Sequence, residues 1–166
     1  MGIIAQSMVG IGLIISLAAC ATGDRVATDS DKQPSSSSQS QATVIDLTQV
    51  GCQFLEVEAQ DYQYQPQEAS DCQKINSETI AMRKKEFKPL ALKPGKYIFR
   101  VQNKNVPYSL GFYLRGEGLK QVSLPKISGG GITQGVTKDY EISLKPGKYL
   151  FSCPLNPTPD YSILVN

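Results

Sequence analysis

Two near-identical stretches of the sequence decide its fold: LKPGKYIF at residues 92–99 and LKPGKYLF at residues 144–151. Each has a Pro-Gly pair at its third and fourth positions, which favours a tight turn because proline fixes φ at one corner and glycine accepts the positive φ of the next. In each, Tyr and Phe then stand two positions apart, which places both on one face of a strand. Each copy therefore predicts a turn that starts a strand. The copies begin 52 residues apart (92 to 144) and fit the two halves of a Greek-key sandwich.

Runs with the same two-residue period surround these copies and bring the number of predicted strands to about nine. They lie at residues 44–47, 52–58, 87–92, 97–101, 109–115, 121–124, 139–144, 149–153 and 161–165. We interpret the Gly-rich residues 128–131 as a flexible hairpin connection, because they lack the Lys-Ser/Thr pair and the helix of a phosphate-binding loop. The expected fold class is all-β, and the expected architecture is a Greek-key sandwich. An immunoglobulin-like sandwich is the alternative.

One segment has helical spacing. Apolar residues recur at Cys72, Ile75, Ile80 and Met82, roughly with the period of a helix. The sequence SDCQ at residues 70–73 resembles a capping box. We therefore predict one short helix near residues 71–84, inserted among the strands.

The composition restricts the chemistry available to the chain. It has 166 residues with no His and no Trp, and 17 Lys plus Arg against 15 Asp plus Glu give a net charge of +2. Without imidazole there is no Ser-His or Cys-His catalytic pair and no His-based metal site. The small net charge gives no reason to expect nucleic acid as a partner. We expect one domain with appendages that is not an enzyme, with an enzyme accessory subunit or a weak hydrolase as the minor alternative.

The N-terminal apolar run is too short to cross a bilayer comfortably. Residues 3–17 are mostly apolar, and Leu17-Ala18-Ala19-Cys20 ends the run. This tetrapeptide resembles the lipobox of bacterial lipoproteins. The resemblance implies that residues 1–19 are a signal peptide and that Cys20 is acylated and becomes the mature N-terminus. Residues 1–17 contain no Lys or Arg, which departs from the usual signal; a short buried helix is the alternative interpretation.

A polar tract follows the expected signal peptide. Residues 28–43 contain no aromatic side chain and no aliphatic one larger than Ala, so they cannot bury enough apolar surface to offset their ordering entropy. We expect residues 20–43 to be a disordered linker that reaches roughly 25 Å as a flexible coil. Residues 44–166 then form the folded domain, with a core at 79–166 and an N-terminal extension at 44–78. Acylated Cys20 would hold this domain on membrane lipid, facing the periplasm or the cell exterior.

Over about residues 79–166 the sequence resembles the cupredoxins, the blue-copper sandwich proteins. The shared pattern is a strand that ends at Asn103, a corner at Pro107-Tyr108, and the sequence PGKYLFSC at residues 146–153 followed by a closing strand. In that family, copper binds a His of the corner and a Cys, a His and a Met of the last loop. The resemblance therefore implies a cupredoxin-like Greek-key β-sandwich.

The same resemblance implies that this chain has lost its metal. Tyr108 stands in place of the corner His, Asn156 and Tyr161 stand near the positions of the loop His and Met, and Cys153 alone remains of the four ligands. Neither an amide nor a neutral phenol replaces imidazole for copper. We therefore expect no type 1 copper and no other cofactor. We also expect these four vestigial metal-site positions to lie together at one end of the sandwich.

If Cys20 is acylated, three thiols remain. Cys52 and Cys72 bracket a polar excursion with little core of its own, and a disulfide between them would stabilise the fold by about 3 kcal/mol. We favour this pairing, with a disulfide to Cys153 or no disulfide as the alternatives. Because Cys153 alternates with Tyr149 and Phe151, we expect its thiol to be buried and inert.

Acidic and basic residues are concentrated in different segments of the chain. Residues 44–72 contain six acidic and no basic side chains, whereas residues 73–126 contain 12 basic and three acidic ones. The first explanation is that the acidic segment packs beside the basic one; the second is a basic docking patch for an acidic partner or for anionic headgroups. Glu56 and Glu58 would share a strand face as a carboxylate pair, but no substrate cleft is visible beside them.

These observations favour a membrane-anchored binding or scaffold protein without type 1 copper, whose protein partner the sequence does not name. The proline-rich loop at residues 154–159, with Tyr108, Tyr113 and Tyr161, is a candidate recognition surface. The alternative function is that of a redox or metal-handling protein that binds copper through the Cys153 thiolate.

Overall fold

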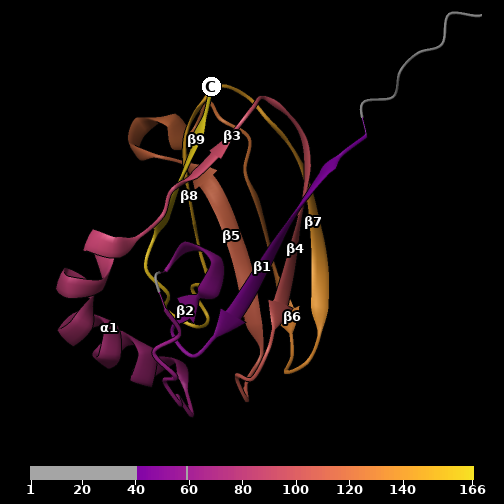
Figure 1. Cartoon of the computed structure of the whole chain (residues 1–166). Coiled ribbons are helices and arrows are strands. Elements are labelled where there is room, and N and C mark those ends of the chain that lie inside the picture. Colours follow the sequence, from indigo (N-terminus) through magenta and orange to yellow (C-terminus); the bar gives the residue numbers. More distant parts are fainter. Residues whose placement is uncertain (1–40, 59) are drawn as a thin grey trace, which may run out of the picture. The chain divides into compact units, whose positions relative to one another are not determined.

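Two β-sheets face each other across one core in the computed structural model of the protein (Figure 1). The structure describes residues 41–58 and 60–166. The expected signal peptide, Cys20 and most of the expected linker lie outside these residues. Within the described ranges, no helix is both long enough and apolar enough to cross a bilayer.

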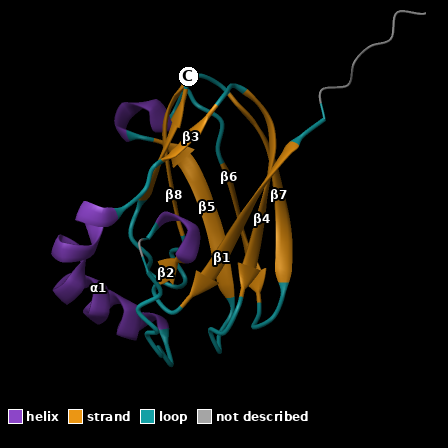
Figure 2. Ribbon diagram, viewed as in Figure 1, coloured by secondary structure: helices purple, strands orange, loops and turns teal. Residues whose placement is uncertain are grey.

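The first sheet has four strands in the order β2-β1-β4-β7, and the second has five in the order β3-β9-β8-β5-β6. The strands of the first sheet are β1 (Thr43–Val50), β2 (Gln53–Phe54), β4 (Gly95–Asn103) and β7 (Thr137–Leu144). Those of the second sheet are β3 (Leu90–Leu92), β5 (Leu110–Gly116), β6 (Ile127–Ile132), β8 (Gly147–Ser152) and β9 (Tyr161–Val165). The helix α1 (Ala69–Arg83) lies outside the sandwich, beside β2 (Figure 2).

The strand order contains a Greek key. Strands β5, β6 and β7 are neighbours in space as in sequence, and β8 returns to pair with β5 on its other side. Both Pro-Gly turns start strands as expected, because β4 begins at Gly95 and β8 at Gly147. The expected fold class, an all-β Greek-key sandwich with one short helix, is confirmed. Strand β1 lies inside its sheet, between β2 and β4, so it is part of the core and not an extension.

Buried phenylalanine rings from both sheets pack against one another in the core of the sandwich. Phe99 of β4 and Phe112 of β5 stack with ring centroids 5.6 Å apart, and Phe54 of β2 meets Phe151 of β8 edge-on at 5.2 Å. All four side chains are fully buried. Each such ring contributes about 1.5–3 kcal/mol, so these contacts between distant parts of the sequence hold the two sheets together.

The helix α1 agrees with the helix expected near residues 71–84, but its start differs. Glu68 is the N-cap, and its side chain and that of Asp71 each accept a bond from the other residue's backbone N–H. The capping box is therefore formed by Glu68 and Asp71, not by residues 70–73. Carboxylates also suit this end of a helix because its free N–H groups carry positive partial charge. A 3-10 turn at Lys84–Glu86 continues the chain.

The prediction of a strand at residues 121–124 is wrong. This segment is the end of a 3-10 turn, Gly118–Gln121, and the tight loop that follows it. The Leu124 N–H donates to the Lys120 carbonyl at 2.9 Å, which turns the chain back on itself. The strand predicted at residues 52–58 is limited to β2, because Leu55–Val57 forms a 3-10 turn.

The Gly-rich residues 128–131 are not a flexible connection, because they form the middle of β6. A Cβ atom on Gly129 would lie 2.8 Å from the ring of Tyr140, and one on Gly111 of the neighbouring strand would lie 2.8 Å from the Gly129 carbonyl oxygen. The glycines are therefore explained by close packing against β6, and not by a need for mobility.

The loops gather at the two ends of the sandwich. We call one of them the entry end; it holds the start of β1, the β3–β4 turn, the β5–β6 loop and the β7–β8 turn, as the strand registers require. The far end holds the β1–β2 turn, the β4–β5 corner, the β6–β7 turn and the β8–β9 loop. The entry end is at the top of Figure 1, where the C-terminus also lies.

Candidate functional site

The expected metal-site positions belong to the far end, and Asn156 of the β8–β9 loop is at their centre. Its side chain is completely buried. Its Nδ2 donates to the Val50 carbonyl at 2.9 Å, and its Oδ1 accepts from the Cys52 N–H at 3.2 Å. Val50 is the last residue of β1 and Cys52 belongs to the turn that follows it, 106 and 104 residues away in sequence. The amide thereby ties the last loop of the domain to its first strand.

Tyr108 reaches Asn156 from the β4–β5 corner. Its hydroxyl donates to Asn156 Oδ1 at 3.1 Å. Burial, with smaller contributions from Cys153 and Asp71, raises the pKa of Tyr108 to about 12. The hydroxyl therefore stays protonated at neutral pH and remains a donor. Tyr108 and Asn156 are thus in direct contact, as the cupredoxin resemblance implies.

The expected disulfide between Cys52 and Cys72 is confirmed, and it closes the same end. It fastens α1 to the β1–β2 turn, and the Cys72 sulfur lies 3.3 Å from Asn156 Oδ1. One helical turn later, Asn76 Nδ2 donates to the Pro157 carbonyl at 2.6 Å. The helix is therefore attached both to the first strand, by a covalent bond, and to the last loop.

Cys153 is a free and fully buried thiol. Its Sγ accepts a bond from the Gly111 N–H at 3.3 Å, and its backbone N–H donates to the Thr158 hydroxyl at 2.8 Å. Burial raises the pKa of Cys153 above the ordinary thiol value, which keeps the sulfur in its protonated and weakly nucleophilic form. The burial predicted from strand alternation is therefore present.

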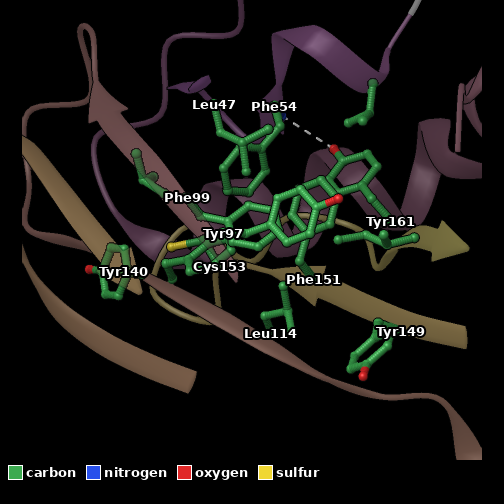
Figure 3. Packing of buried hydrophobic residues seen from close by; sticks show 14 of the residues in the cluster. Leu47, Phe54, Tyr97, Phe99, Leu114, Tyr140, Tyr149, Phe151, Cys153 and Tyr161 are labelled. Carbon is green, nitrogen blue, oxygen red and sulfur yellow. Dashed lines mark hydrogen bonds between the residues drawn. The ribbon is translucent and has the colours of Figure 1, made fainter. Parts of the chain in front are cut away.

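Tyr161 does not join this group, although its ring packs in the same core. Its hydroxyl points toward the Phe54 backbone nitrogen (Figure 3), whose N–H donates to it at 3.4 Å, and it donates to Glu58 Oε1 at 2.5 Å. Of the four expected positions, Tyr108 and Asn156 are hydrogen-bonded to each other, and the Asn156 N–H donates to the Cys153 carbonyl at 3.2 Å. The side chain of Tyr161 belongs to a second cluster.

That second cluster surrounds a buried ion pair for which the sequence alone gave no prediction. Arg83 and Glu58 are 3% and 5% exposed. The guanidinium donates to both carboxylate oxygens, through Nε at 2.9 Å and Nη2 at 2.5 Å. Tyr62 and Tyr64 stack on each other, and their ring centroids lie 5.1 and 5.4 Å from the Arg83 guanidinium carbon. Burial, and then Glu58, hold the pKa of Tyr161 well above its ordinary value, so its hydroxyl remains a donor to the carboxylate.

Glu56 and Glu58 do not form the expected carboxylate pair. Glu56 is exposed and accepts a bond from the Thr48 N–H at 2.9 Å, whereas Glu58 is buried against Arg83. The 3-10 turn between β2 and Glu58 removes the strand alternation that would have put both side chains on one face. The sequence signal that could have suggested the Glu58–Arg83 pair was the separation of charge along the chain. Glu58 lies in the acidic segment and Arg83 in the basic one.

The residues at the far end do not fit the type 1 copper site of the cupredoxins. Both polar atoms of the Asn156 side chain are bonded to the β1–β2 turn, and the Tyr108 hydroxyl and the Cys153 thiol are held in their protonated forms. Such a site needs imidazole and thiolate donors. In residues 41–58 and 60–166, no group of three or more Cys, Asp or Glu side chains is arranged to hold a metal ion.

An open groove of about 650 Å³ lies beside this end, between β5, β6 and the β8–β9 loop. Its lining includes Gly111, Tyr113, Ile127 and Leu155. Leu155 is 48% exposed. The loop that carries it contains three prolines and is bonded internally between Cys153 and Thr158, so Leu155 is presented on a restrained backbone.

No protein-family model matches the chain, and no curated protein matches it. Among solved structures the chain is similar to auracyanin B, with a TM-score of 0.42 and 10% sequence identity. The match covers 75% of this chain and 89% of the auracyanin chain.

Proposed function

We propose that this protein is a lipid-anchored, exported binding or scaffold protein that works at a bacterial membrane surface without type 1 copper and without catalysing a reaction. The observation that carries the proposal is the bonding of Asn156. A residue at an expected ligand position instead holds the last loop against the β1–β2 turn. An end of the sandwich that is fixed in this way presents its surface in one arrangement, which lowers the entropy cost of binding a partner.

The proposal assigns the partner contact to Leu155 and the groove beside it. A partially exposed leucine on a proline-rich loop offers an apolar anchor at low entropy cost, and Tyr113 and Ile127 extend the apolar surface. The partner is then a protein segment that inserts an apolar side chain into this groove. The polar Ser-rich linker would give the domain room to meet such a partner near the bilayer.

The second candidate function, redox or metal handling by Cys153, has less support. Metal binding and thiol exchange both need a thiolate, and Cys153 is buried, with its pKa raised by that burial. An intense blue absorption band on addition of Cu(II) to the protein would favour this second candidate over the first.

Lipid attachment is tested by metabolic labelling with a fatty acid. The full chain should incorporate the label, and Cys20→Ala should abolish incorporation because it removes the proposed sulfur acceptor. Cys153→Ala is the matched control; it removes a buried thiol and should leave the label unchanged. Label retained in the Cys20→Ala variant would show that the lipobox interpretation is wrong.

Partner contact is tested by a photo-reactive amino acid placed at Leu155 of the acylated chain in its native membrane. We expect a discrete crosslinked species from this position. Leu164 on β9 is the matched control, because it is 41% exposed against 48% for Leu155 but lies on a strand away from the groove. Crosslinks of equal yield from both positions, or none from Leu155, would contradict the proposed binding surface.

A further inference from the structure

Two large apolar side chains at the entry end are almost completely exposed. Leu119 and Val122, in the loop between β5 and β6, are 97% and 94% exposed. No other large hydrophobic side chain in the described part of the chain exceeds 68%. Single exposed apolar residues are common on protein surfaces, but here two of them project from one short turn.

The loop that carries these side chains is held in place. The Lys120 N–H donates to the Glu117 carbonyl at 3.1 Å, and the Leu124 N–H donates to the Lys120 carbonyl at 2.9 Å. The loop also packs on the β7–β8 turn, where a Cβ atom on Gly147 would lie 2.8 Å from Leu124. Leu119 and Val122 are therefore presented by an ordered turn.

Exposed lysines lie in the same loop and at two other turns of the entry end. They are Lys93 and Lys96 around the β3–β4 turn, Lys120 in the loop itself, and Lys145 and Lys148 at the β7–β8 turn. Among residues 41–58 and 60–166 the three ion pairs involve none of these lysines. The acidic groups nearby are Glu117, Glu141 and the C-terminal carboxylate, so the surface has a positive excess.

An apolar tip at an end of the sandwich that carries five exposed lysines matches the interface of an anionic bilayer, where apolar side chains enter between lipids and ammonium groups meet phosphates. The position of this surface favours the same occupant. Strand β1 begins at the entry end, so the segment that leads back to Cys20 joins the domain here. An acyl chain on Cys20 would therefore bring this end of the domain to the membrane.

We propose that the entry end docks on anionic lipid headgroups, with Leu119 and Val122 inserted among the lipids and the five lysines on the phosphates. This inference rests on the proposed function and adds an orientation to it. Leu155, in the β8–β9 loop, lies at the opposite end of the strands, so the docked domain holds this proposed anchor of the partner away from the membrane.

The test uses the acylated full chain in phosphatidylglycerol vesicles that contain brominated lipid, a quencher buried in the bilayer. A fluorophore is attached at Gln121→Cys in the apolar loop or, as the matched control, at Asn105→Cys at the far end; both positions are exposed. The native thiols do not compete for the label, because Cys20 is acylated in the proposal, Cys52 is paired with Cys72 and Cys153 is buried. We expect strong quenching at position 121 and none at position 105.

Two sets of variants separate the contributions. Lys120→Gln with Lys148→Gln should lower the docking equilibrium about 25-fold, since each lysine near an anionic surface changes it about fivefold. Leu119→Ser with Val122→Ser should reduce quenching at position 121 in the same vesicles. All four side chains are exposed, so circular dichroism should show an unchanged fold. Phosphatidylcholine vesicles, which carry no net charge, should give weak quenching.

Quenching at position 105, or no quenching at position 121 while the acylated chain remains on the vesicles, would overturn the docking inference and leave the anchoring intact. If position 121 became protected only when membrane proteins were added, the entry end would bind an acidic protein and not lipid. That result would also overturn the docking inference. A chain that carries no acyl group contradicts the proposed anchoring instead. Its docking is then decided separately, by co-sedimentation of the unacylated chain with phosphatidylglycerol vesicles.

Discussion

Replacement of Arg83 by Met should lower the free energy of unfolding by about 3–5 kcal/mol, because it leaves the Glu58 carboxylate buried without its partner. Both side chains are almost completely buried, so the carboxylate loses two guanidinium bonds at a place with little access to water. Asn76 and Thr79 also lose the donor that Arg83 supplies to them. The measurement is equilibrium denaturation in urea, followed by circular dichroism.

The matched control is Arg100→Met. Arg100 and Asp139 form an ion pair of similar geometry at 2.8 Å, but their side chains are 46% and 41% exposed, and exposed pairs contribute little to stability. The double variant Arg83→Met with Glu58→Leu should recover part of the loss, because no charge is then left uncompensated. Equal losses from Arg83→Met and Arg100→Met would contradict the importance of burial.

Asn156→Leu should lower the free energy of unfolding by about 2–4 kcal/mol. Leucine has nearly the same volume, but it leaves the Cys52 N–H and the Val50 carbonyl buried without partners, and each unpaired group costs about 1–3 kcal/mol. Tyr108→Phe removes one bond to the same amide and should have a smaller effect. Urea denaturation with the disulfide intact measures both changes.

Asn105→Leu provides the comparison for Asn156→Leu. Asn105 is an exposed asparagine of the β4–β5 corner, at the same end of the sandwich. Its replacement should change stability little, because surface substitutions of this kind stay within about 0.5 kcal/mol. If Asn156→Leu proved as mild as Asn105→Leu, the amide would not be what holds the last loop to the β1–β2 turn.

The elements that sequence reasoning found are those fixed by local chemistry. The Pro-Gly turns and the alternation after them specify β4 and β8 without reference to the rest of the chain. At residues 121–124 the alternation of Val122 and Leu124 suggested a strand, but that turn depends on a distant fit. A Cβ on Gly147 of the β7–β8 turn would lie 2.8 Å from Leu124, and this close approach of two distant segments is visible only in three dimensions.

The candidate site also divides into features that the local sequence predicts and features that depend on distant contacts. The Cys52–Cys72 disulfide was predictable, because the two cysteines bracket a segment without a core of its own. The contact of Tyr108 with Asn156 followed from a family resemblance. The pairing of Arg83 with Glu58 had no local signal, because charged side chains are rarely buried and these two are 25 residues apart. For the same reason the direction of the Tyr161 hydroxyl was not foreseen.

The parallel pairing of β1 with β4 gives the domain a direction in which it resists mechanical force. Seven residue pairs, from Thr43 with Tyr97 to Gln49 with Asn103, join the two strands side by side. A pull on the N-terminal end of β1 acts along the strand, so it loads the evenly spaced bonds of this ladder together and in shear, where a pull across the sheet would break them one by one. Tension that passes along β1 next reaches Cys52, where a covalent bond transfers it to α1. A load applied between the start of β1 and the β8–β9 loop is therefore carried by this ladder, by the disulfide and by the bonds of Asn156 to Val50 and Cys52.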